Sequence, residues 1–378
     1  MKNNPLKQLL TLGQSIWLDY IRRDLIASGG LRHLIEEDGL RGMTSNPSIF
    51  EKAIVDSHDY DEDILSMALA GKGAEAIYET LSQSDVQPAA YEFLSLYKRT
   101  GGKDGYVSLE VNPHLAHNTN GTIEEARRLW DELNRPNVLI KVPATSNGLP
   151  AIQQLISEGI NINVTLLFGV SRYRQAAEAY IAGIQERVVK GKSVKQAASV
   201  ASFFVSRIDA LVDSQLEKLI EQGGKQAELA KKVRGQTAIA CAKMAYQVYK
   251  EIFDSDRFKR LAAEGAAVQR LLWASIGTKN PDYSDVKYVE ALIGADTVNT
   301  VPLETIDAYR DHGQPEARLG QGVIEAGWVL DQLPELGIDI DNAAVQLENE
   351  GVEKFTKPFD KLIETLMQRS SPYLRKEA

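Results

Sequence analysis

The sequence contains only one cysteine, Cys241, in 378 residues. A single cysteine cannot form an intramolecular disulfide, and it excludes a zinc site built from several thiolates. Histidine is also scarce, with five residues. His114 and His117 lie three residues apart, but their segment reads as a loop and lacks a third ligand motif. We therefore expect no metal ion and no other cofactor.

The chain also lacks an excess of positive charge. It has 43 lysines and arginines against 52 aspartates and glutamates, which gives a net charge of −9. General nucleic-acid binding depends on a surplus of basic residues, so we expect no nucleic-acid partner. An anionic substrate would need a local basic pocket, because the overall field of an acidic protein repels it.

Long apolar runs are missing as well. No run reaches the roughly 18 residues of a membrane-spanning helix. The segment Met1–Leu12 has neither the apolar core nor the small-residue cleavage site of a secretory signal. Together with the lone cysteine, which fits a reducing compartment, these absences predict a cytoplasmic protein without a membrane partner. The oligomeric state stays open, and a homo-oligomer is possible.

Eight short apolar or alternating runs, bounded by turn residues and separated by helix-length segments, are present instead. Such runs predict β-strands, and their alternation with helices is typical of parallel βα units. We expect the strands at Ser15–Tyr20, Leu40–Thr44, Tyr106–Val111, Val138–Val142, Ile160–Leu167, Val200–Val205, Leu271–Ile276 and Thr297–Val301.

Two intervals between the expected strands are long, Pro47–Thr100 and Arg207–Gln269, and both are helical in pattern. We interpret them as enlarged connections, so that residues 1–378 form one domain. The predicted fold is α/β, a (β/α)8 TIM barrel with extra helices after strands 2 and 6 and at the C-terminus. An open doubly wound sheet is the alternative, but it usually carries a glycine-rich fingerprint after its first strand, and none is present.

Three helix boundaries can be predicted from local signals. Thr122 and Glu125 have the spacing of a capping box, which would make Thr122 an N-cap. The segment Thr44–Pro47 reads as a turn and N-cap with Pro47 at the first helical position. The stretch Asn342–Leu374 looks helical, and Pro358 is expected to kink or break it.

Lys141 interrupts the apolar run Val138–Val142. Loss of solvation favours the neutral form of a lysine, and a neutral amine can attack a carbonyl to form a Schiff base. A lysine that snorkels at a strand end or pairs with a core carboxylate is the other interpretation.

Two carboxylates have similar settings, Asp19 in the first expected strand and Glu110 in the third. Period-two alternation puts Glu110 on the polar face of its strand, the face that points into a barrel. An interior carboxylate near a lysine can be its counter-ion or a general acid or base. Because barrel active sites are assembled at the C-terminal ends of several strands, three ionisable residues at three strand ends favour a functional role.

Polar side chains also mark the fifth strand, where Asn161, Asn163 and Thr165 alternate with apolar residues. They form either a satisfied polar layer or a surface that recognises hydroxyls and orients a water. The expected sixth and seventh strands end in further candidates, namely Ser202, Phe204 and Arg207, then Ser275 and Lys279. Phosphate sites of barrels often use the loops after the late strands, which favours Arg207 and Lys279 as phosphate ligands. Taken singly, each of these two residues can equally be interpreted as an ordinary surface charge.

Several of these segments together resemble the strand motifs of transaldolases. They are Leu40–Phe50, Val138–Thr145, Asn161–Phe168, Ser202–Arg207, Trp273–Pro281 and Thr297–Pro302. The resemblance spans most of the chain, and its length and the Ser275–Asn280 loop are similar to the longer bacterial subfamily. It implies a (β/α)8 barrel that transfers a dihydroxyacetone unit from sedoheptulose 7-phosphate to glyceraldehyde 3-phosphate, giving erythrose 4-phosphate and fructose 6-phosphate. Sugar phosphates would then be the partners.

The resemblance also implies a role for each matching residue. Lys141 would form the Schiff base, Glu110 would act through a water that Thr165 orients, and Asp19 would take the C4-hydroxyl proton. Substrate hydroxyls would be held by Thr44, Asn46, Asn163 and Ser202. Arg207 would bind phosphate. Many transaldolases have an arginine at the position of Gly277, so here Lys279, near Ser275, is the cation expected to replace it.

Other functions stay open at this point. Related fructose-6-phosphate aldolases release free dihydroxyacetone and typically carry a tyrosine where Phe204 stands, so Phe204 favours transfer over release. A catalytically silent barrel would have lost part of the lysine–carboxylate set, which this chain retains.

Overall fold

The protein is described here by a computed structural model that covers residues 4–374. Eight parallel strands form a closed barrel in which each strand pairs with the next and β8 pairs with β1. The strands are β1 Gln14–Asp19, β2 Gly42–Thr44, β3 Tyr106–Glu110, β4 Val138–Pro143, β5 Ile162–Leu167, β6 Ser199–Phe204, β7 Arg270–Ala274 and β8 Thr297–Val301. The predicted (β/α)8 barrel is therefore confirmed, with strand ends displaced by no more than two residues.

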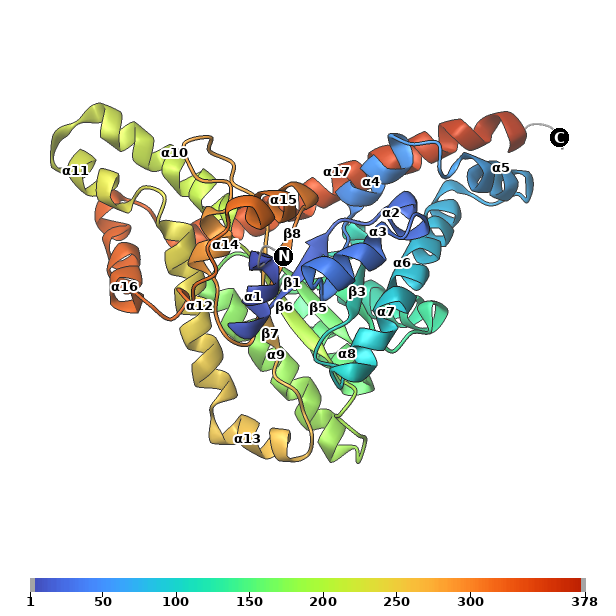
Figure 1. Ribbon diagram of the computed structural model, residues 1–378, viewed down its shortest axis with the longest axis horizontal. Helices are drawn as coiled ribbons and strands as arrows, with labels where there is room; N and C mark the ends of the chain where they lie inside the picture. Colours follow the sequence, from blue (N-terminus) through green and yellow to red (C-terminus); the bar gives the residue numbers. More distant parts are fainter. Residues whose placement is uncertain (1–3, 375–378) are drawn as a thin grey trace.

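Helices surround the barrel (Figure 1). Before β5 they are α1 Pro5–Thr11, α2 Arg23–Ala27, α3 Gly30–His33, η1 Leu34–Asp38, α4 Pro47–Val55, α5 Asp61–Leu69, α6 Ala74–Arg99, η2 Pro113–Leu115, α7 Thr119–Leu133 and α8 Gly148–Glu158. After β5 they are α9 Val170–Val189, α10 Ser206–Gln222, α11 Gly224–Val233, α12 Thr237–Phe253, α13 Asp256–Ala263, α14 Lys287–Ala291, α15 Leu303–His312, α16 Val323–Gln332, η3 Pro334–Leu336 and α17 Ile340–Leu374.

The additional helices lie where the sequence predicts them. Helices α4 to α6 follow β2, α10 to α13 follow β6, and α16 and α17 follow the last barrel helix. Cys241 is buried on α12, and burial raises the pKa of its thiol to about 12, so it is an inert core residue. Among the described residues, none of the helices combines the length and the apolar character needed to cross a membrane.

The long helix α17 determines the shape of the barrel mouth. It packs against α4, α5, α6 and α10 and reaches β5, and Figure 1 shows it running from the barrel alongside α4 and α5. The helix continues through Pro358, so the expected break is absent and that part of the prediction is wrong. Burial of Phe355, Phe359 and Leu362 against the barrel helices offsets the cost of a proline in a helix interior, which is about 3 kcal/mol.

A second local prediction is wrong at α7. The helix begins at Thr119 with Asn118 as its N-cap, whose side chain accepts from the Gly121 N–H at 3.0 Å. The Thr122 hydroxyl donates instead to the Leu115 carbonyl. At α4 the prediction is confirmed, because the Asn46 side chain caps the helix and Pro47 is its first residue.

Candidate active site

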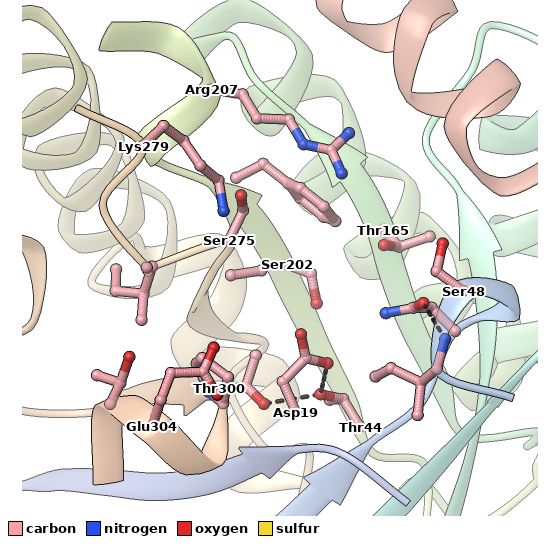
Figure 2. A pocket seen from close by; sticks show the side chains of 18 of the residues that line it. Asp19, Thr44, Ser48, Thr165, Ser202, Arg207, Ser275, Lys279, Thr300 and Glu304 are labelled. Carbon is pink, nitrogen blue, oxygen red and sulfur yellow. Dashed lines mark hydrogen bonds between the residues drawn. The ribbon is translucent and has the colours of Figure 1, made fainter. Parts of the chain in front are cut away.

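A cavity of about 530 Å³ opens at the C-terminal ends of the barrel strands. Ten of the twelve predicted site residues line it: Asp19, Thr44, Asn46, Lys141, Thr165, Ser202, Phe204, Arg207, Ser275 and Lys279. Figure 2 shows the Arg207 and Lys279 side chains on one side of this cavity and Asp19 and Thr44 on the opposite side. The cavity thus has a cationic end and an end with a carboxylate and hydroxyls.

Lys141 lies in the middle of a row of polar residues across three neighbouring strands. Its Cα pairs with that of Glu110 on β3 and that of Asn163 on β5, so the three side chains start at one level. The Lys141 Nζ lies 3.1 Å from Glu110 Oε2 and donates to the Ser45 carbonyl at 2.8 Å. The lysine is therefore held by a carboxylate and a carbonyl while its amine faces the cavity.

The end of β4 is fixed by a close backbone contact. A Cβ at Gly148, the first residue of α8, would lie 1.9 Å from the Pro143 carbonyl oxygen. Only glycine fits there, because the atom in the way belongs to the backbone. The turn that follows Lys141 can therefore be tight.

Burial also governs the proton affinity of Glu110. Its side chain is 3% exposed, and this burial raises its pKa against the opposing charge of Lys141. A carboxylate that keeps a raised pKa beside an ammonium can take a proton from that amine at 3.1 Å and return it. Glu110 lies beside the lysine but does not line the substrate-sized cavity.

Asp19, at the end of β1, accepts a hydrogen bond from the Thr44 hydroxyl at 2.7 Å. The Thr44 oxygen also lies 2.7 Å from the Thr300 hydroxyl, and both contacts are drawn in Figure 2. Burial raises the pKa of Asp19, and the charge of Lys141 opposes that shift. Asp19 is thus a second carboxylate whose environment favours proton uptake.

Thr165 contributes a free hydroxyl. Its Oγ1 is buried and has no hydrogen-bond partner among residues 4–374. The β5–β6 register shifts just beyond it, and Leu166 has φ 61°. Irregular strands of this kind often redirect side chains beside active sites. A bound water or substrate oxygen could use this hydroxyl.

Ser202 and Asn163 act as a unit. The Ser202 hydroxyl donates to Asn163 Oδ1 at 2.6 Å, and Asn163 Nδ2 donates to the Ser108 hydroxyl at 3.0 Å. Asn163 therefore lies behind Ser202 and does not line the cavity. This arrangement orients the Ser202 oxygen.

The cationic end consists of Arg207, at the start of α10, and Lys279, in the loop after β7. Burial lowers the pKa of both, and the charge of Arg207 further lowers that of Lys279. Within residues 4–374 no carboxylate lies at ion-pair distance from either one, and Arg207 Nη1 is buried without a partner. Ser275, at φ 52°, lines the cavity beside them. Two cations without an ion-pair partner among the described residues could bind an anion.

Sequence reasoning missed several lining residues, including Ser48, Lys52, Thr300, Glu304 and Phe355. Thr300 directly follows Asn299 in β8, so a simple polar–apolar alternation does not single it out. Phe355 has no local signal either, because it comes from α17, far along the chain. Its ring centre lies 5.6 Å from Lys141 Nζ.

The site does not resemble a metal centre. In the described part of the chain, no group of three or more His, Cys, Asp or Glu side chains could hold a metal ion. His114 Nε2 lies 2.7 Å from the Asp360 carboxylate on α17. The chemistry that the cavity can support is nucleophilic attack by an amine, proton transfer by two carboxylates and binding of an anion.

Comparison with known proteins gives a consistent result. The family model described as transaldolase/fructose-6-phosphate aldolase matches residues 16–366. The chain is 48% identical over 371 residues to "Transaldolase 2" of Nostoc sp., covering 97% of both chains. It is 48% identical to "Transaldolase" of Trichodesmium erythraeum, covering 98% of both. It is 46% identical to "Transaldolase" of Thiobacillus denitrificans, covering 95% of this chain and 99% of that one.

Proposed function

The chain belongs to the transaldolase/fructose-6-phosphate aldolase family, and we propose that it catalyses the transaldolase reaction through a Schiff base on Lys141. Its curated relatives that are named transaldolase are 44–48% identical to it, and transaldolases are transferases. The chain is therefore an enzyme of the transferase class. Those relatives do not favour fructose-6-phosphate aldolase, the alternative activity. The proposed reaction transfers a dihydroxyacetone unit from sedoheptulose 7-phosphate to glyceraldehyde 3-phosphate, a step of the non-oxidative pentose phosphate pathway.

The observation that carries the proposal is that Lys141 lines the same cavity as two cations, Arg207 and Lys279. A ketose phosphate has a carbonyl at one end and a phosphate at the other. One molecule can therefore reach the amine and the anion site together.

Covalent chemistry begins when the lysine amine attacks the ketose carbonyl. Glu110 accepts the proton that the amine must lose and returns protons as water leaves, through a water oriented by the free hydroxyl of Thr165. The product is a protonated imine on Lys141. This imine can accept an electron pair, so no metal is needed for the next step.

Asp19 promotes the bond cleavage. It removes the proton of the C4 hydroxyl, the C3–C4 bond breaks, and its electron pair moves into the imine. Erythrose 4-phosphate leaves as the aldehyde. Attack of the three-carbon unit on the aldehyde of glyceraldehyde 3-phosphate, with Asp19 returning its proton, forms the new bond. Hydrolysis of the imine then releases fructose 6-phosphate.

Hydroxyl groups of the substrate are held by the polar lining. Thr44, which already donates to Asp19, and Ser202, which is oriented by Asn163, would contact the bound intermediate. Asn46 contributes its amide nitrogen, since its carbonyl oxygen caps α4. Phe204 and Phe355 form the apolar wall.

Phosphate is bound by Arg207 and Lys279, with Ser275 beside them. The absence of neighbouring carboxylates within ion-pair distance supports this role for the described residues, because a bound phosphate would supply the missing negative charge. Gly277 leaves open space in the loop, since a Cβ there would contact nothing within 4 Å. Lys279 is thus proposed to replace the arginine that many transaldolases carry at that position.

We extend the proposal to the remaining properties of the chain. Residues 1–378 form one domain, which the family match over residues 16–366 supports. The protein acts in the cytoplasm on sugar phosphates, without nucleic acid, and as a monomer or homo-oligomer.

A product assay tests the proposed reaction. The protein is incubated with sedoheptulose 7-phosphate, with and without glyceraldehyde 3-phosphate. We expect sustained formation of erythrose 4-phosphate only when the acceptor is present. Steady release of free dihydroxyacetone from fructose 6-phosphate without an acceptor would instead establish the aldolase activity. Variant Lys141→Ala serves as the inactive control.

A further inference from the structure

A second cavity lies behind β3, between the barrel and α6, α7 and α17. Its volume of about 20 Å³ is enough for about one water molecule. It is lined by Glu75, Tyr78, Glu79, Ser82, Leu109, Glu110, Asn112, Glu125, Leu129 and Phe359. None of these residues except Glu110 belongs to the chemistry described above.

Glu110 connects this rear cavity with the barrel interior. It pairs with Lys141 on the barrel side, and it also borders the rear cavity. Within residues 4–374, neither of its carboxylate oxygens has a hydrogen-bond partner besides that ion pair. Glu110, which must change its charge during catalysis, therefore borders a space of about the size of one water molecule, separate from the substrate-sized cavity.

Tyr78 lines the rear cavity together with Glu110 and Glu125. Burial raises the pKa of the Tyr78 hydroxyl, and the carboxylates of Glu110, Glu125 and Glu79 raise it further, in that order. The hydroxyl is thus close enough to all three carboxylates to sense their charge. Its ring is fixed by edge contacts with Phe50 and Phe359.

Glu125 lies at the solvent side of this arrangement. Its side chain is 14% exposed, and it accepts a hydrogen bond from the Asn112 N–H at 3.1 Å. Burial raises the pKa of Glu125 to about 7. Arg128 lies 3.7 Å away, and Glu75 and Glu79 on α6 oppose ionisation. A group of this kind gains and loses a proton readily near neutral pH.

We propose that Glu125 exchanges protons with Glu110 through the rear cavity while substrate fills the barrel mouth. The proposal rests on the function proposed for Glu110. In one direction, a proton leaves the Glu110 carboxyl for the water in the cavity, with the Tyr78 hydroxyl beside it. That water passes a proton to the Glu125 carboxylate, which releases it to solvent. The reverse sequence reloads Glu110, so atoms and charge balance.

Glu125 acts through Glu110 and does not touch substrate, so it is a positioning and relay residue. Substitution Glu125→Gln keeps an oxygen for the Asn112 N–H but removes the exchangeable proton. We expect kcat to fall by about tenfold, less than for a direct acid or base. KM for sedoheptulose 7-phosphate should stay unchanged. The limb of the kcat–pH profile near pH 7 should disappear, while Arg128, Glu75, Glu79 and Tyr78 remain in place.

Two matched variants complete the test. Glu125→Asp keeps an ionisable carboxyl and should retain the limb near pH 7. Asp131→Asn removes an exposed carboxylate further along α7, outside the cavity, and should leave the profile unchanged. An unaltered profile in Glu125→Gln, or loss of the limb in Asp131→Asn as well, would overturn the relay.

A borohydride trap separates failure of the relay from failure of the proposed function. If wild-type protein and Glu125→Gln both form a reduced adduct at Lys141, but their pH profiles agree, only the relay is wrong. If the wild-type protein forms no adduct there, the covalent mechanism is wrong, and the relay falls with it.

Discussion

Two arginines on opposite ends of the barrel illustrate how one fold uses buried charge in two ways. Arg270, at the start of β7, is 5% exposed and contacts Asp104 at 2.9 Å and the Ser15 hydroxyl at 2.9 Å. Arg207, beyond the end of β6, faces the cavity beside Lys279, and its Nη1 has no partner in the described residues. The first arginine has its counter-ion in the fold, whereas the second has none among the residues that the structure describes.

The difference follows from the direction of the strands. The N-terminal ends of parallel strands form the stability face of a barrel, and the C-terminal ends carry the chemistry. A buried ion pair that is complete holds elements together, while removal of one partner leaves a costly unpaired charge. Uncompensated cations and carboxylates with raised pKa destabilise the fold slightly, and in the proposed function the substrate would compensate them. Substitutions at the two ends should therefore act on different quantities.

Lys141→Ala should give the largest effect on activity. Loss of the nucleophile removes the covalent route, so we expect kcat to fall by roughly 10⁴-fold or more. The melting temperature should change little, because Glu110, with its raised pKa, can bind a proton in place of the lost ion pair. Steady-state assays and thermal unfolding check both statements. Unchanged turnover would show that the barrel mouth does not work through this lysine.

Asp19→Asn should separate activity from stability at the same end. We expect kcat to fall by roughly 10²- to 10⁴-fold, since a general base is lost. Because the folded pKa of Asp19 is raised, the wild-type carboxylate costs stability above its ordinary pKa of about 4 and costs nothing below it. The variant should therefore be more stable at neutral pH, and the gain should vanish as pH falls towards 4. Denaturant unfolding at two pH values measures this, and equal gains at both would refute the assignment.

Arg270→Met should show the opposite pattern. Removal of this arginine leaves the buried Asp104 unpaired, so unfolding free energy should drop by about 3 to 5 kcal/mol. The folded fraction should keep its kcat and KM, because the pair lies at the end of the barrel away from the cavity. Chemical denaturation with activity measured below the transition tests the prediction. A loss of kcat without loss of stability would invalidate the comparison of the two ends.

Arg207→Ala should have a smaller and more selective effect. A hydrogen bond to a charged group contributes about 1.5 to 3 kcal/mol, so kcat/KM for sugar phosphates should fall by roughly 10- to 100-fold. Stability should not decrease, since no ion pair of Arg207 is lost. Unphosphorylated ketoses provide the control, because their turnover should hardly change. An equal loss for phosphorylated and unphosphorylated substrates would remove Arg207 from the phosphate site.

Much of the fold and site could be predicted because both depend on local periodicity. The alternation of apolar and polar residues predicted the strands of the barrel. In the structure, Lys141 and Glu110 lie opposite each other on neighbouring strands. Predictions failed where long-range packing or competing partners decide the outcome. Asn118 caps α7 in place of Thr122, and α17 continues through Pro358 because its apolar face is buried. Phe355 could not be placed over the site, since no local pattern shows which helix crosses the mouth.

Trapping of the covalent intermediate tests the central claim most directly. The protein is incubated with fructose 6-phosphate, reduced with borohydride, digested and analysed by peptide mass. The account predicts a reduced sugar adduct on the peptide that contains Lys141, and its absence in Lys141→Ala. An adduct at a different lysine, such as Lys279, or no adduct at all, would contradict the assignment of Lys141 as the Schiff-base residue.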